Sequence, residues 1–248
     1  MRRWTYALRE RCSWSTPPWK WTIGPSAALS AVPTAARSRA AVLMALYDTT
    51  RWAECCGPTE WAESLYTLDL LDRWTPERLP EGRCLDVGSK NAAYLPALAT
   101  AVPRGWDAVE IDAHRRYLDG STRRAHGERV ARCFDGCRFV AGDVRAQTGP
   151  WALVTWFLPF LTQAPLAAWG LPDELLAPVD LLRHVTGRLV PGGTLLVVNQ
   201  GEHELRLQHA LFAELGLEPT LLGHVRSALS PYRQQRFAWR WTRPVEHA

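Results

Sequence analysis

The stretch Arg83–Leu95 reads RCLDVGSKNAAYL, and it decides the fold. Apolar residues surround Asp86 in its first half, which predicts a short buried strand that ends at Val87. Gly88 follows, then three polar residues, and a run with helical character begins at Leu95. A strand that leads through a glycine into a helix is the basic unit of sheets built from parallel strands.

The rest of the chain continues this alternation. A helix starts near Thr59, carries apolar residues at three- and four-residue spacing, and ends before Pro76. We expect further helices over 95–102, 114–132, 178–189 and 202–215. We expect strands over 83–87, 107–111, 137–141, 153–157, 194–199, 221–225 and 237–241, with a turn at 191–193. This order predicts an α/β fold with a doubly wound, mostly parallel, seven-stranded sheet.

Composition narrows the class of protein. The 248 residues are 47% hydrophobic, enough for a sizeable core, and no apolar run is long enough to cross a membrane. A net charge of +4 does not by itself indicate a nucleic-acid partner. Six cysteines occur, but only Cys133 and Cys137 are close to metal spacing, and no second pair supports them. We therefore expect no metal site, free thiols and a cytoplasmic location.

The N-terminal region differs from the remainder. Residues 1–43 are rich in Arg and Ser and contain one acid, Glu10. A transit peptide would have this composition, and so would a mis-assigned extension ahead of a start at Met44. We expect residues 1–43 to be poorly ordered, residues 44–80 to form a helical cap or lid, and residues 81–248 to form the α/β domain.

Acidic side chains stand where three strands end. Asp86, Glu110 and Asp143 lie at the ends of the first three strands, and ligands of such sheets bind beyond the carboxyl ends. Glu110 follows Gly88 by 22 positions, the spacing at which a carboxylate reaches ribose hydroxyls. The second glycine of the dinucleotide fingerprint G-x-G-x-x-G is replaced by Lys90, which disfavours a pyrophosphate.

Four motifs in order carry a family resemblance: LDVG at 85–88, VEID at 109–112, GDV at 142–144 and LVPGG at 189–193. Together they resemble class I S-adenosylmethionine-dependent methyltransferases, over residues 80–200 and extending to 243 with the last two strands. The runs TWFLPF at 155–160 and NQGE at 199–202 resemble a bacterial branch of that family. Residues 81–248 would then be the S-adenosylmethionine-binding domain.

The resemblance implies a role for each strand end. The loop after the first strand would wrap the methionine tail, Asp86 would hold that loop or the ammonium, and Glu110 would bind the ribose. Asp143 would meet the adenine amino group, with Val144 against the ring. The implied cofactor-binding residues are Asp86, Gly88, Ser89, Lys90, Asn91, Glu110, Ile111, Asp143, Val144 and Thr155.

The acceptor is expected beyond the fourth strand. Trp156 and Phe160 are the candidate substrate-binding residues, and aromatic walls suit a flat or apolar small molecule. A base is needed only if the acceptor loses a proton, and the candidates are Glu202 and His203. The run FLPF lacks the polar first residue of the Asn/Asp-Pro-Pro-aromatic motif, which disfavours nucleic acid. Residues 51–65 are a candidate lid over this site.

Plainer interpretations stay open at this stage. Asp86 is also a suitable turn cap, Glu110 a suitable solvated acid, Glu202 a suitable first-turn acid for a helix dipole, and the aromatic rings suitable core residues. Two other functions compete with methyl transfer. One is an NAD-dependent oxidoreductase, disfavoured by Lys90 and by the absence of a Tyr-x-x-x-Lys pair. The other is a binding module that keeps the fold without catalysis.

Overall fold

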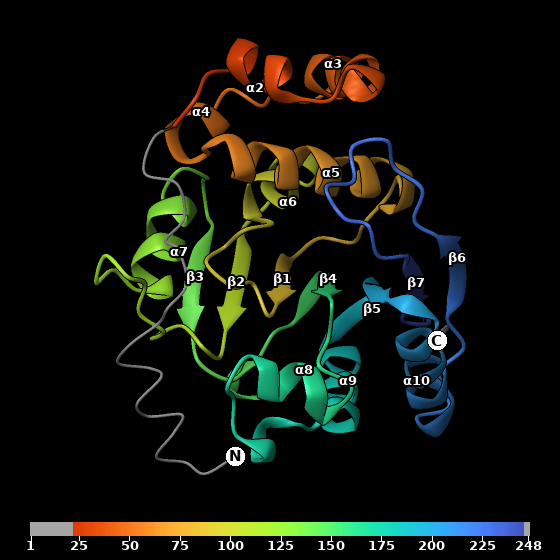
Figure 1. Ribbon diagram of the computed structural model, residues 1–248. Coiled ribbons are helices and arrows are strands. Elements are labelled where there is room, and N and C mark those ends of the chain that lie inside the picture. The colour runs from red at the N-terminus through yellow and green to blue at the C-terminus, as the bar shows by residue number, and fades with distance from the viewer. Residues whose placement is uncertain (1–21, 246–248) are drawn as a thin grey trace.

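A computed structural model describes residues 22–245, and residues 1–21 and 246–248 lie outside that description. Seven strands form one sheet in the order β3-β2-β1-β4-β5-β7-β6, in which β7 alone runs antiparallel to both neighbours (Figure 1). The strands are β1 Arg83–Val87, β2 Trp106–Glu110, β3 Arg138–Ala141, β4 Trp151–Phe157, β5 Leu189–Gln200, β6 Thr220–His224 and β7 Arg236–Thr242. The predicted seven-stranded, doubly wound sheet is confirmed.

Helices cover both faces of the sheet, with α5 and α6 on one side and α9 and α10 on the other (Figure 1). Strand β1 shows how alternation builds the two layers, because Cys84 belongs to the core under α5 and α6, and Leu85 and Val87 belong to the opposite core. The helices are α2 Pro25–Ala31, α3 Arg37–Leu46, α4 Trp52–Cys55, α5 Pro58–Trp74, α6 Leu95–Ala101, α7 Arg123–Ala131, α8 Gln163–Ala168, α9 Pro178–Gly187 and α10 Gly201–Glu214. Short 3-10 turns occupy Thr34–Ala36, Val144–Ala146 and Asp173–Leu175.

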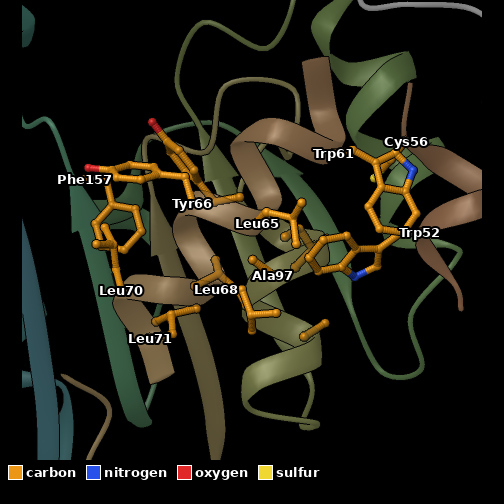
Figure 2. Close-up of a cluster of buried hydrophobic side chains, with 14 of the residues drawn as sticks. Trp52, Cys56, Trp61, Leu65, Tyr66, Leu68, Leu70, Leu71, Ala97 and Phe157 are labelled. Atoms are coloured by element: carbon orange, nitrogen blue, oxygen red, sulfur yellow. The ribbon is translucent and has the colours of Figure 1, made fainter. Parts of the chain in front are cut away.

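Helix α5 is the main support of the first layer. Pro58 occupies its first turn, and the Glu60 carboxylate accepts a hydrogen bond from the Gly57 N–H at 3.1 Å. Its apolar residues Leu65 and Leu68 are fully buried and point toward Ala97 of α6 (Figure 2). Helical spacing in the sequence therefore located this element correctly, one residue from its expected start.

The region before α5 differs from its expectation. Residues 25–43 were expected to lack order, yet α2 and α3 pack over α5 (Figure 1). Arg39 of α3 explains the docking, because its guanidinium donates to the buried Asp69 and to Asp72 at 2.6 Å each. A chain that began at Met44 would leave Asp69 with Arg73 as its only cation among the described residues. Residues 1–21, which fall under the same expectation, lie outside the described part.

Three local predictions need correction. Helix α7 begins at Arg123, not at His114, because the Thr122 hydroxyl caps it by accepting from the Ala125 N–H at 3.1 Å. Helix α8 was not predicted at all. The sequence at 191–193 is not a turn but a register shift within β5, where Gly193 accepts a hydrogen bond from the Arg243 N–H at 2.8 Å.

None of the helices in residues 22–245 combines the length and the apolar character that crossing a membrane would require.

Candidate cofactor and acceptor site

A pocket of about 340 Å³ opens at the carboxyl ends of β1, β2, β3, β4 and β5. This is the edge at which a doubly wound sheet binds ligands. The pocket collects most of the site residues predicted from the sequence. The predicted residues that line it are Gly88, Lys90, Glu110, Ile111, Asp143, Val144, Trp156 and Phe160.

The loop after β1 adopts left-handed backbone at three alternate positions. Gly88, Lys90 and Ala92 have φ angles of 73°, 53° and 61°. Glycine adopts this region freely, whereas other residues lose about 1–2 kcal/mol there. The loop thus retains the conformation of a glycine-rich loop while carrying side chains at two of the three positions.

Backbone hydrogen bonds hold that loop in place. The N–H groups of Gly88 and Ser89 both donate to the Val109 carbonyl, at 3.0 and 3.1 Å. The Lys90 N–H donates to Oε2 of Glu110 at 2.7 Å. Three consecutive donors therefore point at β2 and are not available to a phosphate.

Glu110 connects the loop to β2. Its Oε1 accepts from the Asp112 N–H at 2.8 Å, and Arg123 Nη1 lies 3.9 Å from the same oxygen. Burial raises the pKa of the carboxyl, and the Arg123 charge and the backbone donors oppose that shift. A carboxylate offers about four lone-pair sites, so two remain for hydroxyl donors. Glu110 is thus both a structural acceptor and a pocket residue, not a solvated acid.

Asp86 lies behind the loop, outside the pocket lining. It is 0% exposed, and its Oδ1 accepts a hydrogen bond from the Thr155 hydroxyl at 2.8 Å. Its Oδ2 is buried as well. Burial raises the pKa of Asp86 to about 7, against the lowering effects of the hydrogen bonds from Ser89 and Thr155. Thr155 and the buried Ser89 also stand outside the lining, as does Asn91.

Asp143 follows β3 and is already occupied. Its carboxylate accepts from the Arg145 N–H at 2.8 Å and forms an ion pair with the Arg145 guanidinium at 2.5 Å. Burial would raise its pKa, but the bonds from Arg145 outweigh burial and lower it. Arg145 also lines the pocket. The predicted cofactor-binding residue Asp143 is therefore paired with a cation that the sequence analysis did not predict.

The comparisons with known proteins bear on the fold. No family model and no curated protein sequence matches the chain. Solved structures do match. Geranyl diphosphate methyltransferase in complex with GPP and sinefungin superposes with a TM-score of 0.51 at 14% identity, over 73% of this chain and 77% of that one. A Nostoc punctiforme protein described as an O-methyltransferase gives 0.50 at 13% identity, over 74% and 58%.

The chain has the class I methyltransferase fold. Another match is the S-adenosylmethionine-dependent methyltransferase SibL, with a TM-score of 0.48 and 18% identity over 75% of this chain. The chain spans 57% of the length of SibL. At these identities the similarity establishes the fold, and the activity has to be argued from the site.

In this class I fold, a segment between β4 and α9 closes one side of the pocket. Phe160 and Trp169 pack edge to face, with ring centroids 5.4 Å apart. The Arg123 guanidinium lies 4.3 Å from the centroid of a Trp169 ring, and Arg115 donates to the Trp169 carbonyl. Arg115 from the loop after β2 and Arg123, the first residue of α7, thus hold an aromatic wall that comes from a distant part of the chain.

The predicted catalytic pair does not reach the pocket. Glu202 and His203 are exposed on α10, and neither lines the site. Glu204 and Gln200 do line it, and the Glu204 carboxylate accepts from the Gln200 N–H at 2.8 Å. Two residues along a helix rotate the side chain by about 200°, which separates Glu204 from Glu202. Glu204 is therefore the acid of α10 that lines the pocket, and burial raises the pKa of its carboxyl against the effect of the Gln200 hydrogen bond.

Residues 51–65, the expected lid over the acceptor site, do not line the pocket. Trp52 and Trp61 are 0% and 1% exposed, and their ring centroids are 5.0 Å apart. The Trp52 indole donates to the Thr100 hydroxyl of α6 at 2.8 Å. Figure 2 shows both rings beside the core of α5, so Trp52 and Trp61 belong to the buried core of this protein.

Proposed function

We propose that this protein binds S-adenosylmethionine and transfers its methyl group to a small-molecule acceptor. One observation carries the choice of cofactor. The N–H groups of Gly88, Ser89 and Lys90 all donate to β2, at Val109 and Glu110. A dinucleotide site needs such donors for its pyrophosphate. A cofactor with adenosine but no phosphate suits a pocket lined by carboxylates instead.

The residues present fit such a cofactor. Two acceptor sites remain on Glu110 for ribose hydroxyls, and Asp143 and Val144 stand at the β3 end of the same pocket. Asp86 supports this site from behind, because it lies outside the pocket lining and its Oδ1 accepts a hydrogen bond from the Thr155 hydroxyl. S-adenosylmethionine supplies an already activated methyl group, so positioning of the acceptor provides most of the rate.

The acceptor end is assigned to the aromatic and proline-rich wall. Trp156, Phe160 and Trp169 offer apolar surface, while Gln200 and Glu204 are the polar groups at the β5 end. An acceptor with a flat or apolar body fits such a wall. Glu204 takes a proton from acceptors that must lose one, and the raised pKa of this carboxyl makes it a better base.

Thermal unfolding with added ligand tests the proposal. S-adenosylmethionine or S-adenosylhomocysteine at 100 times its dissociation constant should add about 2.7 kcal/mol, and the midpoint should rise by about 5–10 °C. NAD should give no shift. Stabilisation by NAD alone would overturn the cofactor assignment, and no shift with any of the three would favour the binding-module alternative. Methyl transfer from labelled cofactor to a panel of apolar hydroxyl and amine compounds then tests turnover.

A further inference from the structure

Lys90 holds a position where its own backbone is strained. Its φ of 53° is one that glycine adopts without cost, and the same loop uses glycine at position 88. A side chain kept at such a position points to a function for that side chain. The Lys90 backbone already bonds to Glu110, which glycine would do equally well. The function therefore has to be sought at the ammonium group.

The Lys90 ammonium is available to a ligand. Its Nζ lies 5.4 Å from the centroid of the Tyr94 ring, and the residue lines the pocket. No carboxylate of residues 22–245 lies within 4.0 Å of the Nζ. Glu63 and Glu110 are the acids whose charge acts on it, and burial lowers its pKa. A partly buried cation without a counter-ion favours an anionic ligand.

We propose that Lys90 binds the carboxylate of the methionine tail of S-adenosylmethionine. This inference rests on the proposed function. That carboxylate is the anionic group of S-adenosylmethionine, and Lys90 presents an ammonium group to the pocket. Charge-assisted hydrogen bonds of this kind are about twice as strong as neutral ones. Lys90 is thus a specificity-determining residue that selects cofactors with an intact amino-acid tail.

Two ligands that differ only in the carboxylate test this role. They are S-adenosylhomocysteine and S-adenosyl-3-thiopropylamine, which is the same molecule without its carboxylate. Calorimetric titration gives the affinity of each for the wild-type protein, Lys90→Gln, Lys90→Arg and Glu63→Gln. A matched surface control is Arg124→Gln, which removes an exposed cation paired with Glu128 outside the pocket.

The wild-type protein should prefer S-adenosylhomocysteine by about 10- to 100-fold. Lys90→Gln should bring that preference close to one while leaving the affinity for the decarboxylated ligand unchanged. Lys90→Arg should retain most of the preference, and Arg124→Gln all of it. Glu63→Gln should retain it as well, because the ammonium does not depend on Glu63 for its position.

The outcomes separate the two proposals. If the wild-type protein binds neither ligand, the proposed cofactor is wrong and the role of Lys90 is wrong with it. If both ligands bind and Lys90→Gln weakens them equally, the cofactor assignment stands and the carboxylate role is overturned. The same result follows if Glu63→Gln abolishes the preference, because Lys90 would then serve the Glu63 carboxylate. Circular dichroism of each variant establishes that it is folded.

Discussion

The helical layer made by α4, α5 and α6 lies next to the loop after β1, and the two regions differ in how well their buried groups are satisfied. In the layer, Trp52, Trp61 and Leu65 are fully buried, and both indole N–H groups have acceptors. In the loop, Lys90 has a strained backbone, and burial raises the pKa of Asp86 behind it to about 7. The difference teaches that stability and ligand binding are assigned to separate elements. A binding loop keeps strained backbone and buried charge only when a rigid layer of packed helices supports it.

The largest effect should come from opening the layer. Trp61→Ala removes a buried indole and its hydrogen bond to the Ile23 carbonyl, so we expect a loss of about 3–5 kcal/mol in unfolding free energy. The affinity of the protein that remains folded for S-adenosylhomocysteine should not change. Urea unfolding and calorimetric titration check the two statements, and a selective loss of affinity would erase the division between layer and loop.

Asp86 should make the stability of the free protein depend on pH. Its pKa in the folded protein is about 7, above the ordinary value of 3.8. The carboxyl therefore does not lower the free energy of unfolding below pH 4, and lowers it increasingly as pH rises toward 7. The cost reaches at most about 4 kcal/mol above that window. Asp86→Asn should remove this slope, which urea unfolding between pH 4 and 8 measures. Equal slopes for the two proteins would show that the carboxyl titrates normally.

Glu110→Ala tests the loop from its anchoring side. Removal of the carboxylate leaves the Lys90 and Asp112 N–H groups without their acceptor and removes the proposed ribose contact. We expect affinity for S-adenosylhomocysteine to fall by about 10- to 100-fold with the fold intact. Glu128→Ala, on the outer surface of α7, is the control. Unchanged affinity in Glu110→Ala would leave Glu110 with a structural role alone.

The smallest effect should be the most discriminating. Lys90→Gly relieves the left-handed backbone but adds freedom to the unfolded chain, so the free protein should gain about 0.5 kcal/mol. The same substitution should weaken binding of S-adenosylhomocysteine. A higher unfolding free energy together with a weaker affinity for S-adenosylhomocysteine would sharpen the contrast between layer and loop. A loss of stability would mean that the Lys90 side chain supports the fold.

Local patterns in the sequence were sufficient for elements whose type and bounds follow from the periodicity of their own apolar residues. Strand β1 and helix α5 follow from alternation and helical spacing. The docking of α3 does not, because Arg39 meets Asp69 thirty residues later, and no periodicity encodes that pair. Helix α7 was misplaced because the polar run from His114 is compatible with a helix, while the Thr122 cap sets its actual start.

The sequence by itself determined the order of strands and helices, the acids at three strand ends and the loop in which lysine replaces glycine. Only the tertiary structure decided which groups are open to a ligand. Asp86 turned out to lie behind the loop, and Glu204 rather than Glu202 faces the pocket. Trp169 reached the site through Arg115 and Arg123. Spacing along the chain specifies the side of an element, whereas burial and hydrogen bonding depend on segments that meet only in the folded protein.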